Sequence, residues 1–270
     1  MVDENWKASL KEFFSQRGAA ISRSALNLED LAFVSGRDPR VWTNEVYQDL
    51  IQNIVNTISA SSKSSILEVG CASGFLAYGL SERVSSYEGI DLAENALIIA
   101  RKLGLKNSSF TLGDGAALPY KSASFDATLC YDVFTNFPNF QVGEELIAEM
   151  LRVTRPGGYV LVGSIPDVSQ QENYIKKVAE VSKSLYEKYG PLNQNYADSK
   201  ISSLNHGWWS KFKYFFKSPN HAVDASIYCY YFKREDFELL GKRMGCDSEF
   251  LELHSLNPYR GFRFNVLYKK

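Results

Sequence analysis

Short apolar runs alternate with longer stretches of helical periodicity through the middle of the chain. After a polar, serine-rich break at residues 59–65, each short apolar run is followed by a stretch in which apolar positions recur at helical spacing. This alternation is typical of consecutive β–α units and predicts a sheet with parallel strands. The predicted strands cover residues 66–69, 87–91, 109–112, 127–131 and 159–163, and the predicted helices cover residues 75–83, 93–103 and 142–153.

The two ends of the chain follow a different pattern. Trp6, Leu10, Phe13 and Phe14 recur at helical spacing, and a second helical pattern covers residues 44–58. These patterns predict helices that lead into the sheet. A helix at residues 235–244 and strands at residues 249–253 and 262–268 are predicted to complete it.

The regular alternation stops between residues 166 and 230, which we interpret as an insertion or lid. It begins with a predicted helix at residues 171–189, and further on it interleaves aromatic residues with lysines. The aromatic residues are Trp208, Trp209, Phe212, Tyr214, Phe215 and Phe216, and the lysines between them are Lys211 and Lys213. Such a segment could form an acceptor pocket, grip a phosphate, a nucleotide-linked sugar or a membrane surface, or simply pack onto the domain.

Length and composition favour a single α/β domain over residues 1–270. Its expected parts are N-terminal helices at 1–60, a cofactor-binding core at 65–165, the insertion at 166–230, and a C-terminal helix and strand pair at 231–270. The 30 basic and 31 acidic residues nearly balance, so we expect no nucleic-acid partner. The oligomeric state stays open.

Two features that are absent from the sequence bear on where the protein is located and on whether it binds a metal. The first residues form no apolar leader, and eighteen consecutive apolar residues occur nowhere, so we expect a cytoplasmic chain without a transmembrane segment, although contact with a membrane surface stays possible. The four cysteines are scattered without a C-x-x-C pair, so we expect neither a metal site nor a disulfide framework.

The strongest local motif is ILEVGCASGFL at residues 66–76, an apolar strand that breaks into a small-residue loop and opens a helix. Gly70 and Gly74 permit close approach of a ligand, and the helix start can receive an anion. Asp91 ends the next predicted strand 21 residues after Gly70, the spacing at which a carboxylate reaches a bound ribose. Ala72 stands where a dinucleotide site requires a second glycine, so a pyrophosphate is poorly accommodated.

At this point the sequence resembles the class I S-adenosylmethionine-dependent methyltransferases. LEVGCASG resembles their first motif, and the segments GIDL at 89–92, GDGAALP at 113–119 with SFD at 124–126, and RVTRPGG at 152–158 resemble their later motifs in the same order. The resemblance spans about residues 65–165 and the C-terminal strand pair. It implies a Rossmann-like, doubly wound, mostly parallel seven-stranded sheet with an antiparallel C-terminal strand, and S-adenosyl-L-methionine as the cofactor.

The resemblance also implies roles for individual residues. Those assigned to the cofactor are Glu68, Gly70, Cys71, Gly74, Asp91, Leu92, Asp114, Gly115 and Tyr131. The glycine loop would surround the methionine part with help from Glu68, Asp91 would accept the ribose hydroxyls, and Leu92 would flank the adenine. Asp114 and the Gly115 backbone would read the adenine amine, and Tyr131 would lie near the sulfonium.

Three of these residues have a simpler alternative. Asp91 could cap the helix that follows it, Asp114 could fix a turn between Gly113 and Gly115, and Tyr131 could be a core aromatic.

Methyl transfer to a hydroxyl would be helped by a general base. The catalytic candidates are Asp132, just past the fourth strand, and His206 and His221 in the insertion, each of which could instead be an ordinary lid residue. His254 is expected to be structural.

Several classes of function can be weighed against these motifs. Adenine N-methylation is disfavoured because the place of the Asn/Asp-Pro-Pro-Tyr segment reads YDVF, and NPY at 257–259 is interpreted as a turn. Cytosine C5 methylation is disfavoured because no Pro-Cys pair occurs. The balanced charge and an aromatic insertion that could cover a pocket lead us to expect O- or N-methylation of a small-molecule, glycan or lipid-linked acceptor. A catalytically silent S-adenosylmethionine-binding module and an NAD-dependent oxidoreductase stay open as alternatives.

Overall fold

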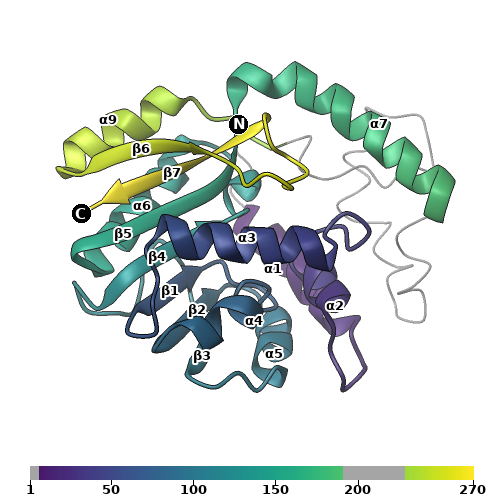
Figure 1. The fold of residues 1–270 in the computed structure, drawn as a ribbon, viewed down its shortest axis with the longest axis horizontal. Helices are drawn as coiled ribbons and strands as arrows, with labels where there is room; N and C mark the ends of the chain where they lie inside the picture. The colour runs from purple at the N-terminus through teal and green to yellow at the C-terminus, as the bar shows by residue number, and fades with distance from the viewer. Residues whose placement is uncertain (1–5, 191–228) are drawn as a thin grey trace.

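The protein is built around one seven-stranded sheet. The computed structural model describes residues 6–190 and 229–270, and its strands lie in the order β3-β2-β1-β4-β5-β7-β6 (Figure 1). The strands are β1 (Ser65–Val69), β2 (Ser86–Asp91), β3 (Ser108–Leu112), β4 (Phe125–Tyr131), β5 (Thr154–Pro166), β6 (Asp247–Glu252) and β7 (Arg263–Lys269). The first five are parallel, and β7 is antiparallel to both β5 and β6. The predicted fold class is confirmed.

Helices cover both faces of this sheet. They are α1 (Trp6–Ala19), α2 (Leu28–Val34), α3 (Asn44–Thr57), α4 (Ala77–Leu80), α5 (Glu94–Lys102), α6 (Phe140–Val153), α7 (Gln171–Tyr189) and α9 (Arg234–Met244). Each predicted helix has a counterpart, but the one predicted at 75–83 is only a single α-turn followed by a short 3₁₀ turn. The sequence pattern did not predict α2. No helix within residues 6–190 and 229–270 is both long and apolar enough to cross a bilayer.

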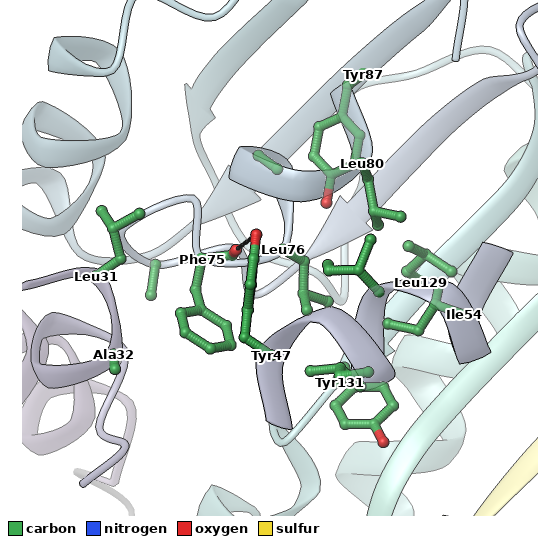
Figure 2. Packing of buried hydrophobic residues seen from close by; sticks show 14 of the residues in the cluster. Leu31, Ala32, Tyr47, Ile54, Phe75, Leu76, Leu80, Tyr87, Leu129 and Tyr131 are labelled. Atoms are coloured by element: carbon green, nitrogen blue, oxygen red, sulfur yellow. Dashed lines mark hydrogen bonds between the residues drawn. The ribbon is translucent and has the colours of Figure 1, made fainter. Parts of the chain in front are cut away.

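One hydrophobic core fills the face of the sheet covered by α2, α3, α4 and α5. Figure 2 shows Tyr47 of α3 beside Phe75, with Leu80, Tyr87 and Leu129 close by. The Tyr47 hydroxyl donates a hydrogen bond of 3.0 Å to the Phe75 carbonyl oxygen, so this buried polar group is paired. The core therefore ties α3 directly to the segment that follows β1.

A second core fills the opposite face, under α6 and α9. Because side chains alternate along a strand, Ile66 points into the first core and Leu67 into the second. Leu146 of α6 and Phe237 of α9 pack in this second core with the β7 residue Phe264. The central strands are thus buried on both sides, as their near-continuous apolar sequences require.

The strand order creates a switch point beside β1. From β1 the chain continues through α4 to β2 and then β3 on one side, and it then crosses to β4 on the other side of β1. In an open sheet of this kind, the loops at the carboxyl ends of the strands diverge at such a point and leave a crevice. The ends of β1, β2 and β4 are therefore the place to look for a ligand site.

Candidate functional site

A crevice opens at the carboxyl ends of β1, β2 and β4. Its empty volume is about 910 Å³, counting open solvent at the mouth. The predicted cofactor residues that line it are Glu68, Gly70, Cys71, Asp91, Leu92, Asp114, Gly115 and Tyr131. Helix α1 contributes one wall through Trp6, Lys7, Leu10, Lys11 and Phe14, and the segment from η2 (Phe134–Asn136) into α6 contributes another through Asn136, Phe137, Val142 and Leu146.

The loop after β1 has a backbone that favours glycine at its first position. Gly70 has φ +83°, and a Cβ atom there would lie 2.4 Å from Cγ2 of Val133. The Gly70 N–H donates 2.8 Å to the Ile90 carbonyl oxygen, which fixes the loop to β2. Gly74 also has positive φ, but it does not line the crevice; it lets the loop approach Ala100 of α5.

Asp91 connects the loop to the start of α5. Its Oδ2 accepts 2.8 Å from the Ala72 N–H, and its Oδ1 accepts 2.8 Å from the Ala93 N–H. The N-cap of α5 is Ala93, not Asp91. Burial raises the pKa of the Asp91 carboxyl. An ionised carboxylate can accept about four hydrogen bonds, so these backbone bonds leave acceptor capacity for a hydroxyl donor from the crevice.

Glu68 and Cys71 lie beneath the loop. Glu68 is buried and accepts 2.5 Å from the Tyr87 hydroxyl, and burial raises its carboxyl pKa to about 7, although Tyr87 and Arg37 oppose the shift. Burial likewise raises the pKa of the Cys71 thiol well above its usual range. The thiol therefore stays protonated and acts as a small packing group, not as a nucleophile.

Asp114 forms a contact that the sequence did not predict. Lys7 Nζ lies 2.6 Å from Asp114 Oδ2, across 107 residues of chain, and ties α1 to the segment after β3. Asp114 Oδ1 also accepts 3.0 Å from the Ala116 N–H, so the turn-fixing alternative describes part of what this side chain does. Burial raises the carboxyl pKa, but the Lys7 and Ala116 hydrogen bonds outweigh it and the net shift is downward. Asp114 is thus a charged acceptor at one end of the crevice.

Tyr131 ends β4 at the other side of the crevice, and Asp132 follows it. Tyr131 is buried, and its ring covers Gly163, where a Cβ atom would lie 2.0 Å from the ring. Asp132 has φ +62°, and its two oxygens face two guanidinium groups. Arg37 Nη2 lies 2.6 Å from Oδ2, and Arg263 Nη1 lies 3.3 Å from Oδ1. No sequence pattern indicated either arginine.

The three histidines fall into two groups. His206, His221 and the aromatic segment around them lie outside the described residues. His254 is buried; its Nδ1 lies 2.8 Å from Asp49 Oδ2, and its Nε2 lies 3.0 Å from Asn257 Nδ2. Both ring nitrogens therefore have partners, and burial lowers the pKa of the imidazole. Asn257 itself accepts 2.8 Å from the Tyr259 N–H, which makes the NPY segment a turn.

The charged groups around the crevice suit a ligand that carries charges of both signs. Four carboxyl groups and three cationic groups line it: Glu68, Asp91, Asp114, Asp132, Lys7, Lys11 and Arg37. A sulfonium is stabilised by nearby carboxylates. The remaining acceptor capacity of Asp91 suits a ribose diol. The crevice therefore fits S-adenosylmethionine in its charge and in its hydrogen-bonding groups.

Comparison with known proteins agrees with this geometry. Residues 67–162 match a family model described as a methyltransferase domain. The chain is similar to the demethylmenaquinone methyltransferase of Deinococcus radiodurans, 39% identical over 112 residues that cover 40% of this chain and 45% of that protein. It is also similar to the fatty-acid O-methyltransferase of Mycolicibacterium smegmatis, 35% identical over 99 residues that cover 36% of this chain and 35% of that protein. The matched segments thus span less than half of either relative.

The fold has relatives among solved structures as well. The magnesium protoporphyrin IX methyltransferase of Synechocystis PCC 6803, with bound S-adenosylhomocysteine, superposes with a TM-score of 0.54 at 13% sequence identity. The superposition covers 97% of this chain and 97% of that one. Identity this low shows the shared fold alone. Residues 67–162 therefore match a methyltransferase domain in sequence, and the chain shares the fold of a solved methyltransferase.

Proposed function

We propose that this chain binds S-adenosylmethionine in the crevice and transfers its methyl group to an oxygen or nitrogen of an apolar small-molecule or lipid-like acceptor. The observation that carries this proposal is the convergence of the Gly70 loop, Asp91 and Asp114 on one crevice. In this arrangement Asp91 accepts the ribose hydroxyls. Asp114 and the Gly115 backbone receive the adenine edge, and the adenine-flanking side chain is Leu92.

The walls of the crevice support the proposal that the acceptor is apolar. Leu10 and Phe14 of α1 and Phe137 and Leu146 near α6 present apolar surface to it. Apolar walls of this kind favour burial of an apolar ligand. The two relatives are named for a demethylmenaquinone and for fatty acids, which are largely apolar molecules. Because the matches cover mainly the cofactor-binding segment, the acceptor proposal depends on this chain's own walls.

Transfer from a sulfonium is an in-line displacement, so the main task of the protein is to hold donor and acceptor in line. The cofactor supplies the methyl group. The chain's residues fix its ribose and methionine portions and exclude water with the apolar walls. Asp132 stays our first candidate for a base, with His206 and His221 as the others. Because Arg37 and Arg263 already occupy the two oxygens of Asp132, acceptors that are ionised before they bind, such as carboxylates and phenolates, suit this site best.

The cofactor proposal can be tested by calorimetric titration with S-adenosylhomocysteine and with NADH. We expect the purified protein to bind S-adenosylhomocysteine and not NADH, and Asp91→Asn to weaken the former at least tenfold because a charged acceptor is lost. Asp126→Asn is the matched control, since Asp126 lies at the amino end of β4 and accepts from the Ser65 N–H and hydroxyl. Binding of NADH alone would contradict the proposal and favour an oxidoreductase.

Catalysis requires a second experiment, because a silent cofactor-binding module would pass the first. Protein supplied with methyl-labelled S-adenosylmethionine and an organic-solvent extract of cells should move label into the lipid fraction. If the label stays on the cofactor whether the aqueous or the lipid fraction of the cells is supplied, the result would favour the silent binding module.

A further inference from the structure

Arg37 presents a buried guanidinium to the crevice, and the proposed function gives it no contact with a ligand. The residue is 8% exposed and lines the crevice with Glu68, Tyr131 and Asp132. A buried cation is costly unless it is fully paired, so a side chain of this kind requires an explanation.

The position of Arg37 is fixed by the end of α2. Gly36 has φ +82° and donates to the Phe33 carbonyl oxygen at 3.0 Å, and the Arg37 N–H donates to the Ala32 carbonyl oxygen at 2.8 Å. These two bonds form a Schellman motif, which ends the helix with a defined chain direction. The Arg37 side chain therefore leaves a rigid turn, not a loose loop.

Helix α2 is in turn joined to the cofactor loop. The Ser73 hydroxyl donates 2.8 Å to the Leu31 carbonyl oxygen, so the loop after β1 and α2 hold each other in place. The guanidinium carbon of Arg37 lies 4.4 Å from the centre of the Phe75 ring and 5.4 Å from that of Trp42. Aromatic faces at this distance hold the plane of the guanidinium but provide no hydrogen-bond acceptor.

The pairing of Arg37 is incomplete in the part of the chain that the structure describes. Its Nη2 donates to Asp132, whose other oxygen is engaged by Arg263, so two buried guanidinium groups share one carboxylate. Its Nε is buried and has no acceptor among the described residues. Buried donors are nearly always paired, so the site has capacity for a further anion.

Other cations that line the crevice are less suited to this task. Lys7 is paired with Asp114 at the opposite end, and Lys11 is exposed on α1.

We propose that Arg37 is a carboxylate-binding residue of the crevice, and this inference rests on the proposed function. The carboxylate is either that of the methionine part of the cofactor or that of a carboxylate acceptor. Its two oxygens accept hydrogen bonds from the planar edge of the guanidinium, whose geometry matches that of a carboxylate.

The test compares ligands that differ only in the carboxylate. Arg37→Gln and wild-type protein are titrated with S-adenosylhomocysteine and with its decarboxylated analogue, which keeps the amine. If the carboxylate belongs to the cofactor, Arg37→Gln weakens S-adenosylhomocysteine about ten- to hundredfold and leaves the analogue within about threefold. If it belongs to the acceptor, both ligands are unaffected, and binding of palmitate to the S-adenosylhomocysteine complex is weakened instead.

Two controls keep the test decisive. Arg23→Gln removes another arginine that is ion-paired to a buried carboxyl, Asp30, but does not line the crevice, and it should leave every ligand unchanged. Arg37→Lys replaces Arg37→Gln in the test if the latter proves unstable. It keeps the charge but loses the planar guanidinium, so it should bind S-adenosylhomocysteine with intermediate affinity. The wild-type preference for S-adenosylhomocysteine over its analogue then shows whether the carboxylate of the cofactor is recognised, and Arg37→Lys shows whether Arg37 recognises it.

The outcomes also separate this inference from the proposed function. Folded Arg37→Gln that binds S-adenosylhomocysteine, its analogue and palmitate as the wild type does would overturn the role of Arg37 and leave the function intact. Wild-type protein that binds no S-adenosylhomocysteine would overturn the function, and the cofactor source of the carboxylate with it.

Discussion

Ala72 holds a backbone conformation that is unusual for a residue with a side chain. Its φ is +43°, within the loop that forms the floor of the crevice, and its N–H donates to Asp91. A left-handed conformation costs a non-glycine residue roughly 1–2 kcal/mol. Strain of this size is retained only where the surrounding contacts determine the backbone, and here Asp91 and the neighbouring loop glycines do so.

We predict that Ala72→Gly is neutral or stabilising. Glycine removes the strain, while the greater freedom of the unfolded chain offsets part of the gain, so the free energy of unfolding should rise by about 0–1 kcal/mol. Urea denaturation followed by circular dichroism measures the change. Gly70→Ala is the opposite case and should destabilise the protein, because its Cβ atom would meet Val133. A loss of more than 1 kcal/mol in Ala72→Gly would show that the methyl group of Ala72 has a packing role.

At the scale of single residues, the sequence indicates those residues whose partners lie nearby in the chain. Gly70 and Asp91 belong to one short strand–loop–helix–strand segment, so their spacing alone predicted that they meet. Lys7 and Arg37 contact Asp114 and Asp132 across 107 and 95 residues. No periodicity or spacing relates positions that far apart, because the meeting depends on how α1 and α2 pack on the finished sheet.

Among the elements, α1 is a wall of the crevice that lies in close contact with α5. Gly18 lies directly against the backbone of α5, and a Cβ atom there would lie 2.4 Å from the Asn95 carbonyl oxygen. Backbone cannot move aside as a flexible side chain can. The approach of α1 to α5 therefore positions Trp6, Lys7 and Leu10 at the crevice.

We predict that Gly18→Leu displaces α1 and weakens cofactor binding. The crevice would lose apolar wall and the Lys7–Asp114 pair together, so affinity for S-adenosylhomocysteine should fall about tenfold or more, and stability by about 1–3 kcal/mol. Ala19→Leu is the matched control, because Ala19 is the exposed neighbour on the same helix. Equal affinity in the two variants would show that α1 is not needed for the cofactor.

The sequence predicted best those helices and strands in which apolar residues recur with a clear period. The predicted bounds of α7 agree with the structure, whereas α2 was missed because seven residues give too few turns for a periodic signal. A local signal was present: Asn27 and Asp30 form a capping box at the start of the helix. Strand β5 extends beyond the predicted 159–163 in both directions, because its pairing with β4 and β7 continues past the apolar run.

On the scale of the whole molecule, stability should depend on the charge of Glu68. Its carboxyl pKa is about 7 in the folded protein, because burial disfavours the ionised form, against 4.5 as the ordinary value. Between these two values the folded state binds more protons than the unfolded state. The stability contribution is therefore largest below pH 4.5 and falls as the pH rises toward 7, by an amount on the order of 3 kcal/mol. His254 acts in the opposite sense, since its lowered pKa favours unfolding as the pH falls below 6.5.

Glu68→Gln should separate these two contributions. The variant cannot ionise at this position, keeps an oxygen that accepts from the Tyr87 hydroxyl, and retains His254 unchanged. Relative to wild type, we expect its free energy of unfolding to increase from pH 5 to pH 8, by up to about 3 kcal/mol. Glu45→Gln, which removes an exposed carboxyl on α3, is the control for the loss of one acidic group. Denaturant titrations of the three proteins at both pH values measure the difference, and parallel pH profiles for wild type and Glu68→Gln would mean that Glu68 is ionised in the folded protein throughout this range.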